Sequence, residues 1–218
     1  MSPLSSLSYA LLQTGTAVFA ITGVLAAARQ NMDVLGLIVI GVVTALGGGT
    51  IRDLLLDVPV FWVGDSNYLG VSALAALGTF VFERRFRETE RALLYLDGVA
   101  TALFAVLATD KALALGHGAG VALVMGVITG IGGGLLRDVI TGHATILLRR
   151  ELYMTPILVG GVLYMQLRAA ALLDPGQTML IAVALIAACG CHSNRCDFET
   201  GQAERKRTMS DKRAKSND

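Results

Sequence analysis

Two segments of this sequence place an arginine and an aspartate shortly after three consecutive glycines, within long apolar stretches. Arg52 and Asp53 end the first segment, and Arg137 and Asp138 end the second. Ionisable side chains in such segments are costly, so they either mark an ion or substrate pathway or pair with one another to hold the fold together. The sequence leaves both roles open for these four residues.

The glycines predict a role for the backbone as well. A glycine costs about 1 kcal/mol relative to alanine inside a helix, so three in a row predict a break. At such a break, carbonyl groups near Thr44 and Thr129 would carry partial negative charge and could coordinate a cation. The alternative is that these small residues serve only the close packing of helices. The expected hinge glycines are Gly47, Gly48, Gly49, Gly132, Gly133 and Gly134.

The elements that must position these residues are long apolar segments. Hydrophobic residues make up 54% of the 218-residue chain and charged residues only 16%, against about 25% charged residues in a typical soluble domain. Seven segments approach the length of about 20 residues that a membrane-crossing helix needs. We therefore expect an all-α membrane protein with seven transmembrane helices and no soluble domain. The expected spans cover residues 7–28, 33–56, 66–83, 92–109, 119–141, 152–171 and 177–192.

The chain also repeats itself. After a shift of 85 residues, each residue of one Gly-Gly-Gly-x-x-Arg-Asp motif falls on the same residue type in the other, and the register extends through three successive spans. Since each unit has an odd number of spans, the second copy is expected to be inverted in the membrane, as in many transport proteins. The expected parts are a first unit over 7–83, an inverted second unit over 92–171, a seventh helix over 177–192 and a basic, disordered cytoplasmic tail over 193–218.

This symmetry predicts how the charges pair. Adjacent residues on a helix point about 100° apart, so we expect each arginine to pair with the acid of the other motif rather than with its own neighbour. Asp97 has no acidic counterpart, because Leu12 occupies its place in the first unit. It either attracts cations to a vestibule or extends to water. Lys111 is assigned to a solvated outer loop.

The distribution of basic residues predicts the orientation. With seven spans the termini lie on opposite sides, and an external N-terminus places the arginines at 84–91 and 149–150, with the basic tail, in the cytoplasm. This agrees with the positive-inside rule. We therefore expect a multi-pass protein of the cell inner membrane with its N-terminus outside and its C-terminus cytoplasmic. The tail either stays free in solvent or binds anionic lipid headgroups.

The doubled Gly-Gly-Gly-x-x-Arg-Asp motif, on spans two and five of seven, resembles the prokaryotic branch of the trimeric intracellular cation channel family. It is equally similar to a related bacterial family of duplicated three-span proteins described as glycine transporters. The resemblance implies a symmetric homotrimer in which each protomer holds its own pore, constricted where two glycine-broken helices meet and permeable to monovalent cations, chiefly potassium. By the same resemblance, the six glycines are hinges, and Arg52 and Arg137 lie near the constriction.

We therefore expect a channel with potassium or sodium as the permeant ion and with Asp53, Asp138 and Asp97 as further charges of the pore. The alternative is a secondary transporter of a small zwitterion such as glycine, because a half-helix N-terminus could hold its carboxylate and carbonyl groups its ammonium. The sequence offers no nucleophile–base pair, recognised metal-ligand spacing or phosphate-binding loop. We expect neither an enzyme nor a cofactor, a bound metal or a nucleic-acid partner.

Overall fold

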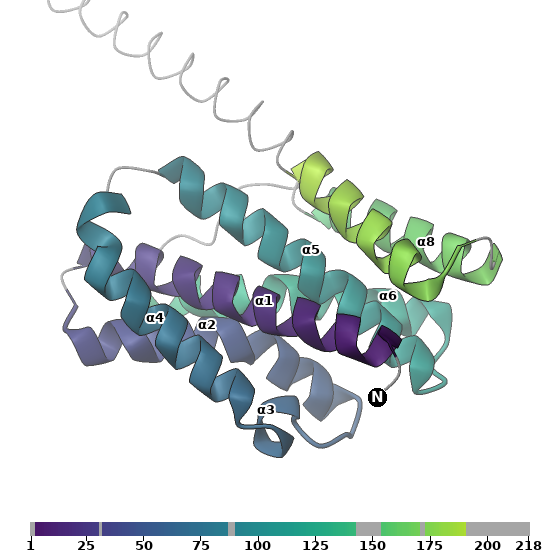
Figure 1. Ribbon diagram of the computed structural model, residues 1–218, viewed down its shortest axis with the longest axis horizontal. Helices are drawn as coiled ribbons and strands as arrows, with labels where there is room; N and C mark the ends of the chain where they lie inside the picture. The colour runs from purple at the N-terminus through teal and green to yellow at the C-terminus, as the bar shows by residue number, and fades with distance from the viewer. Residues whose placement is uncertain (1–2, 31, 87–89, 143–153, 171–172, 191–218) are drawn as a thin grey trace, which may run out of the picture.

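Helices make up nearly all of the described chain. The computed structural model describes residues 3–30, 32–86, 90–142, 154–170 and 173–190 (Figure 1). The elements are α1 (Pro3–Ala27), η1 (Ala28–Gln30), α2 (Val34–Leu55), α3 (Phe61–Gly64), α4 (Asn67–Phe86), α5 (Glu90–Ala114), α6 (Ala119–Ile140), α8 (Met154–Ala170) and a further helix over Pro175–Gly190.

Each of the seven expected spans coincides with a helix. Among the described residues, four helices are long and apolar enough to cross a membrane by length and composition, and they lie over Ser6–Ala27, Val34–Leu55, Leu93–Ala114 and Ala119–Ile140. Shorter apolar helices lie over Asn67–Phe82 and Pro175–Gly190. The all-helical membrane fold is confirmed, whereas the number of crossings stays a prediction. The basic tail at 193–218 lies outside the described residues.

The helices that carry the two motifs end in equivalent ways. α2 ends at Leu55 and α6 at Ile140, in each case two residues after the Arg-Asp pair. Shortly beyond each end, Asp57 and Gly142 adopt positive φ angles of 53° and 64°. A residue in this left-handed conformation commonly terminates a helix. Asp57 and Gly142 are 85 residues apart, so the repeat extends to the backbone of the helix ends.

The two units pack against each other in opposite directions. Where α2 crosses α6, Gly47 lies against Leu136, and Gly132 lies against Ile51. A shift of 85 residues exchanges these two contacts, and the contacts run in opposite directions along the two helices. The structure therefore contains the antiparallel, two-fold relation that an inverted repeat requires.

α1 and α5 support the crossing helices equivalently. An added Cβ at Gly41 of α2 would lie 3.1 Å from a backbone carbonyl of α1, and one at Gly126 of α6 would lie 2.9 Å from the corresponding carbonyl of α5. The rings of Phe19 and Phe104, again 85 residues apart, meet with their centroids 5.2 Å apart. In Figure 1, α1 lies across the middle of the molecule between α4 and α5. The core is thus arranged about the pseudo-two-fold axis.

The glycine triplets do not break their helices. α2 and α6 are helical throughout their lengths, so the expected breaks at Gly47–Gly49 and Gly132–Gly134 were wrong. An added Cβ at Gly48 would lie 2.3 Å from the backbone oxygen of Thr129, and one at Gly133 would lie 2.3 Å from that of Thr44. Close packing at the crossing therefore offsets the poor helix propensity of glycine, which is the alternative that the sequence left open.

Candidate functional site

The two remaining motif glycines, Gly49 and Gly134, differ in how closely their neighbours approach. An added Cβ at Gly49 would lie 2.5 Å from the ring of Phe61, which occupies the space that a side chain would need. Gly134, its counterpart in the second unit, is different. A Cβ there would lie 3.5 Å from the guanidinium of Arg137, an ordinary van der Waals distance. The crossing thus tolerates a side chain at Gly134 but not at its central glycines.

Thr44 and Thr129 are fully buried at the crossing. Their hydroxyls donate hydrogen bonds to the backbone carbonyls of Ile40, at 2.7 Å, and of Met125, at 2.6 Å. Their own carbonyl oxygens lie against the glycines of the opposite unit. Because both helices continue through the motif, the structure does not show these carbonyls freed from the helix, and their coordination of a cation stays a prediction.

The first motif forms a buried ion cluster with a residue from α5. The Nε atom of Arg52 lies 2.7 Å from Oδ1 of Asp53, and Nζ of Lys111 lies 2.7 Å from the same oxygen. The other oxygen, Oδ2, accepts a hydrogen bond from the backbone N–H of Phe61 at 2.9 Å. The guanidinium lies 5.7 Å from the centroid of the Phe61 ring, within cation–π range. One carboxylate is therefore held between two cations.

The second motif forms the reverse arrangement. The Nη1 atom of Arg137 lies 2.6 Å from Oδ1 of Asp97, and its Nε atom lies 2.9 Å from Oδ1 of Asp138. The arginine side chain is 2% exposed, and Asp97 and Asp138 are 15% and 7% exposed. Charged groups that are this well shielded from water are stable only when they are paired with an opposite charge. In this cluster one cation is held between two carboxylates.

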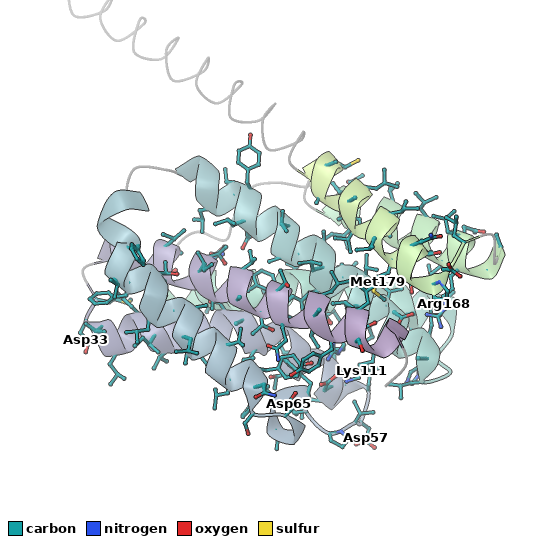
Figure 2. The ribbon with its side chains drawn as sticks, in the orientation of Figure 1. Asp33, Asp57, Asp65, Lys111, Arg168 and Met179 are labelled. Carbon is teal, nitrogen blue, oxygen red and sulfur yellow. The ribbon has the colours of Figure 1, made fainter. Side chains whose placement is uncertain are left out.

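The two clusters lie on opposite sides of the crossing. Arg52 is four residues beyond Gly48 and Arg137 four residues beyond Gly133, so each lies about 6 Å along its helix from the central glycines. The two displacements have opposite directions because the helices are antiparallel. In the view of Figure 2, Lys111, Asp65 and Asp57 lie toward the same side of the molecule, and Asp33, which precedes α2, lies toward the opposite end. The candidate site is the crossing together with the charge cluster on each side of it.

The expected pairing across the pseudo-two-fold axis was wrong. Each arginine pairs through Nε with the aspartate that follows it in the sequence. A difference of about 100° between adjacent positions describes the direction of the Cα–Cβ bonds, but an arginine side chain is long enough to turn back toward its neighbour. The remaining guanidinium nitrogens then reach outward, in the case of Arg137 to Asp97. Asp97 is therefore a structural partner of the second motif rather than an isolated acid.

Lys111 is the site residue that the sequence analysis missed. It lies on α5, which continues to Ala114, and not in a solvated loop. Its side chain is 33% exposed and reaches the fully buried carboxylate of Asp53. The available signal was the run of small and apolar residues that follows it, Ala-Leu-Ala, which extends the helix pattern by one turn. An amphipathic lysine near a helix end can bury its stem while its head meets a partner.

Replacing Asp97 by leucine, the residue at the equivalent position of the first unit, tests the second cluster. Arg137 would keep Asp138 but lose the partner at 2.6 Å. We expect a loss of stability of about 1–3 kcal/mol, the usual cost of leaving part of a buried polar group unsatisfied. The midpoint of thermal unfolding in detergent measures it. The control is Leu77→Met on the exposed outer face of α4, which keeps an apolar side chain of similar size and should leave the midpoint nearly unchanged.

Comparison with known sequences identifies relatives over most of the chain. The glycine transporter family model matches twice, over residues 9–84 and 94–169, and these matches have the same offset of 85 residues as the internal repeat. The inner membrane protein YadS of Escherichia coli is 42% identical over 182 residues, which cover 79% of this chain and 88% of YadS. The membrane protein YvgT of Bacillus subtilis is 32% identical over 151 residues, which cover 68% of this chain and 75% of YvgT.

Solved structures share the fold. The trimeric intracellular cation channel (TRIC) orthologue from Rhodobacter sphaeroides is 37% identical with a TM-score of 0.80, and the match covers 85% of this chain and 97% of that one. A prokaryotic TRIC channel crystallised in 0.5 M KCl is 25% identical with a TM-score of 0.82, and the match covers 89% and 98%. This membrane protein therefore belongs to the glycine transporter family, and it is related in sequence and fold to the prokaryotic trimeric intracellular cation channels.

Proposed function

We propose that this protein is a passive channel for monovalent cations, chiefly potassium, and that each protomer of a homotrimer holds its own path across the membrane. The observation that carries the proposal is the match to the TRIC channel orthologue from Rhodobacter sphaeroides, which extends over nearly the whole of that chain. A fold match alone does not give a function. The buried charge clusters on both sides of the crossing supply the second argument, because ionisable groups inside membrane helices are functional candidates by default.

The proposed path passes the crossing of α2 and α6 and runs by both clusters. An unneutralised arginine 4 Å from a cation would oppose it by about 4 kcal/mol at an effective dielectric constant of 20. The paired carboxylates remove most of this repulsion, Asp53 on one side and Asp97 with Asp138 on the other. Their proposed role is to keep the two arginines from blocking cation entry.

The crossing is also the proposed constriction. Its central glycines leave no room for even one additional carbon atom between the helices. Conduction along this line therefore requires α2 and α6 to separate or rotate relative to each other. Packed helices have discrete alternative arrangements rather than a continuous range, so such a movement would open and close the path in steps.

The family description supports a second candidate, a secondary transporter of glycine or another small zwitterion. Inverted repeats commonly build alternating-access carriers around a central site. The two clusters suit a zwitterion chemically, because the first has two cations around one carboxylate and the second has two carboxylates around one cation. A carboxylate would be attracted to the first cluster and an ammonium group to the second.

Purified protein in planar bilayers separates the two functions. With gradients of potassium, sodium and glycine applied in turn, a channel gives discrete unitary currents whose reversal potentials follow the potassium gradient. A carrier gives saturable uptake of radiolabelled glycine into proteoliposomes without unitary steps. Protein-free bilayers and vesicles are the controls. The absence of both unitary potassium currents and glycine uptake would contradict the two proposals together.

The assembly and the orientation are part of the proposal. The mass of the detergent-solubilised protein, corrected for bound detergent in light scattering, should equal that of three chains. An affinity tag at the N-terminus should be protected from protease in intact spheroplasts only if the N-terminus is cytoplasmic, which would reverse the proposed orientation.

A further inference from the structure

A chain of polar side chains connects α1 to the segment before α4. The side-chain amide of Gln13 donates from Nε2 to the hydroxyl of Tyr9 at 3.0 Å, and this hydroxyl donates to Oδ2 of Asp65 at 3.0 Å. Asn67 donates a second hydrogen bond to the same hydroxyl at 3.2 Å. Figure 2 places Asp65 on the same side of the molecule as Lys111. The four residues form what we call the Gln13 relay.

The relay determines the orientation of the Gln13 amide, that is, which side its NH₂ group and its carbonyl oxygen face. A phenol hydroxyl has one proton, and in Tyr9 it points to a carboxylate, which accepts and does not donate when ionised. Tyr9 can therefore only accept from Gln13, so the NH₂ group must face it. The carbonyl oxygen, Oε1, is left at the other end of the amide.

This oxygen is buried and has no hydrogen-bond partner among the described residues. Leaving a buried acceptor unsatisfied is costly, so each such atom in a native protein calls for an explanation. The relay makes the oxygen a better ligand, because hydrogen bonds in series toward a carboxylate polarise one another and add negative charge to the far end. The chain thus presents a polarised neutral oxygen inside the protein.

The oxygen lies on the side of the crossing that holds the first charge cluster. The ring of Tyr68 joins the two, with its centroid 5.6 Å from that of Tyr9 and 4.9 Å from that of Phe61. Phe61 in turn donates its N–H to Asp53. Phe19 contacts the crossing, and Gln13 is six residues before it, which is about 9 Å along the axis of α1.

We propose that Oε1 of Gln13 binds the monovalent cation that approaches the crossing from this side, either an alkali metal ion or the ammonium group of a zwitterion. The inference rests on the proposed function, because it takes the crossing as the path. A neutral amide oxygen suits a cation that must bind and then move on through the crossing. It replaces one water ligand of the ion without adding a full negative charge, which would hold the ion too tightly to release it.

Binding can be measured without conduction. The midpoint of thermal unfolding of the detergent-solubilised protein is recorded against increasing potassium chloride, with N-methyl-D-glucamine chloride keeping the ionic strength constant, and in a second series against glycine. A ligand that binds only the folded state raises the midpoint with its concentration. We expect one of the two series to stabilise the wild type, and this series identifies the ligand.

Gln13→Met keeps the length of the side chain and removes the oxygen. We expect an apparent affinity about five- to tenfold weaker than that of the wild type, which corresponds to the loss of one polar ligand. Tyr9→Phe keeps the oxygen but releases the amide, and we expect a smaller loss. Thr14→Val removes a hydroxyl whose hydrogen bond is made to Ala10 within the same helix, on an exposed face, and should bind as the wild type does.

The outcomes are distinct. If neither potassium nor glycine stabilises the wild type, or if Gln13→Met and Tyr9→Phe bind with unchanged affinity, the assignment of Gln13 is overturned. If Gln13→Met does not fold, Tyr9→Phe decides. Stabilisation that Gln13→Met weakens, in a protein that gives no unitary currents, supports the Gln13 site and contradicts the channel. Unitary currents from wild type and Gln13→Met with the same conductance and reversal potential contradict the site and leave the channel intact.

Discussion

Gly48→Ala is expected to destabilise the protein by about 3 kcal/mol or more, at the upper end of the range for overpacked interiors. The added methyl group would lie 2.3 Å from the backbone oxygen of Thr129 and 3.1 Å from the backbone nitrogen of Gly133. Backbone atoms in the middle of a packed helix cannot move aside as a flexible side chain does. The gain of about 1 kcal/mol from replacing glycine by alanine in a helix is too small to offset this. Gly133→Ala meets the carbonyl of Thr44 at the same distance and should behave alike.

Gly134→Ala is the matched control. It belongs to the same glycine run and adds the same methyl group, but its nearest neighbours would lie at 3.5–3.7 Å. Helix propensity then decides whether the free energy of unfolding rises or falls. We expect it to be unchanged or higher by up to about 1 kcal/mol. Thermal unfolding in detergent and the fraction of monodisperse protein in size-exclusion chromatography give the comparison. Equal midpoints for Gly48→Ala and Gly134→Ala would show that α2 and α6 do not pack at their glycines.

Asp53→Asn should be the most damaging change of a single charge. The carboxylate is fully buried and is the acceptor for both Arg52 and Lys111, at 2.7 Å in each case. Asparagine keeps the shape and can still accept from Phe61, so the change isolates the charge. Removing one member of a buried ion pair typically costs about 3–5 kcal/mol, because the partner is left buried and uncompensated. The unfolding midpoint and the yield of folded protein measure the effect.

The inverted repeat provides the control for this change. Asp138→Asn alters the equivalent residue, yet Arg137 keeps Asp97 at 2.6 Å. We expect a loss at the lower end of the range for a charged hydrogen bond, about 1.5 kcal/mol. Lys111→Met should recover part of the stability of Asp53→Asn, because it removes one of the two cations left without an anion. Equal losses for Asp53→Asn and Asp138→Asn would contradict the different charge arrangement of the two clusters.

The repeat, the helices and the charged residues of the two motifs could be predicted from the sequence. Apolar length and self-similarity are properties of the chain itself, so they need no knowledge of packing. The continuation of α2 and α6 through their glycines could not be predicted, because helix propensity is a weak preference that tertiary contacts override. At Gly48 the deciding contact is with Thr129, 81 positions further along the chain.

The pairing of the charges failed for a different reason. The direction of the Cα–Cβ bond does not fix where the guanidinium of an arginine lies. The hydrogen bond from Arg52 to Asp53 therefore could not be predicted from the sequence spacing. Lys111 was missed because α5 extends to Ala114, beyond the last residue of its strongly apolar run. Helix ends are the least certain part of any sequence-based assignment, and here one additional turn carries a site residue.

The reciprocal packing at the crossing has a consequence for the ancestry of the fold. Gly48 of one unit fits Thr129 of the other, and Gly133 fits Thr44, so each three-helix unit carries both halves of the contact. Such a surface is self-complementary, and a half-length protein bearing it could pair with an inverted copy of itself before any gene duplication joined the two. Such a homodimer would carry the same charges on both sides, whereas in this chain Asp97 and Lys111 of the second unit correspond to Leu12 and Ala26 of the first. Fusion into one chain made it possible for the two clusters to acquire opposite charge arrangements while the glycine contact between them stayed the same.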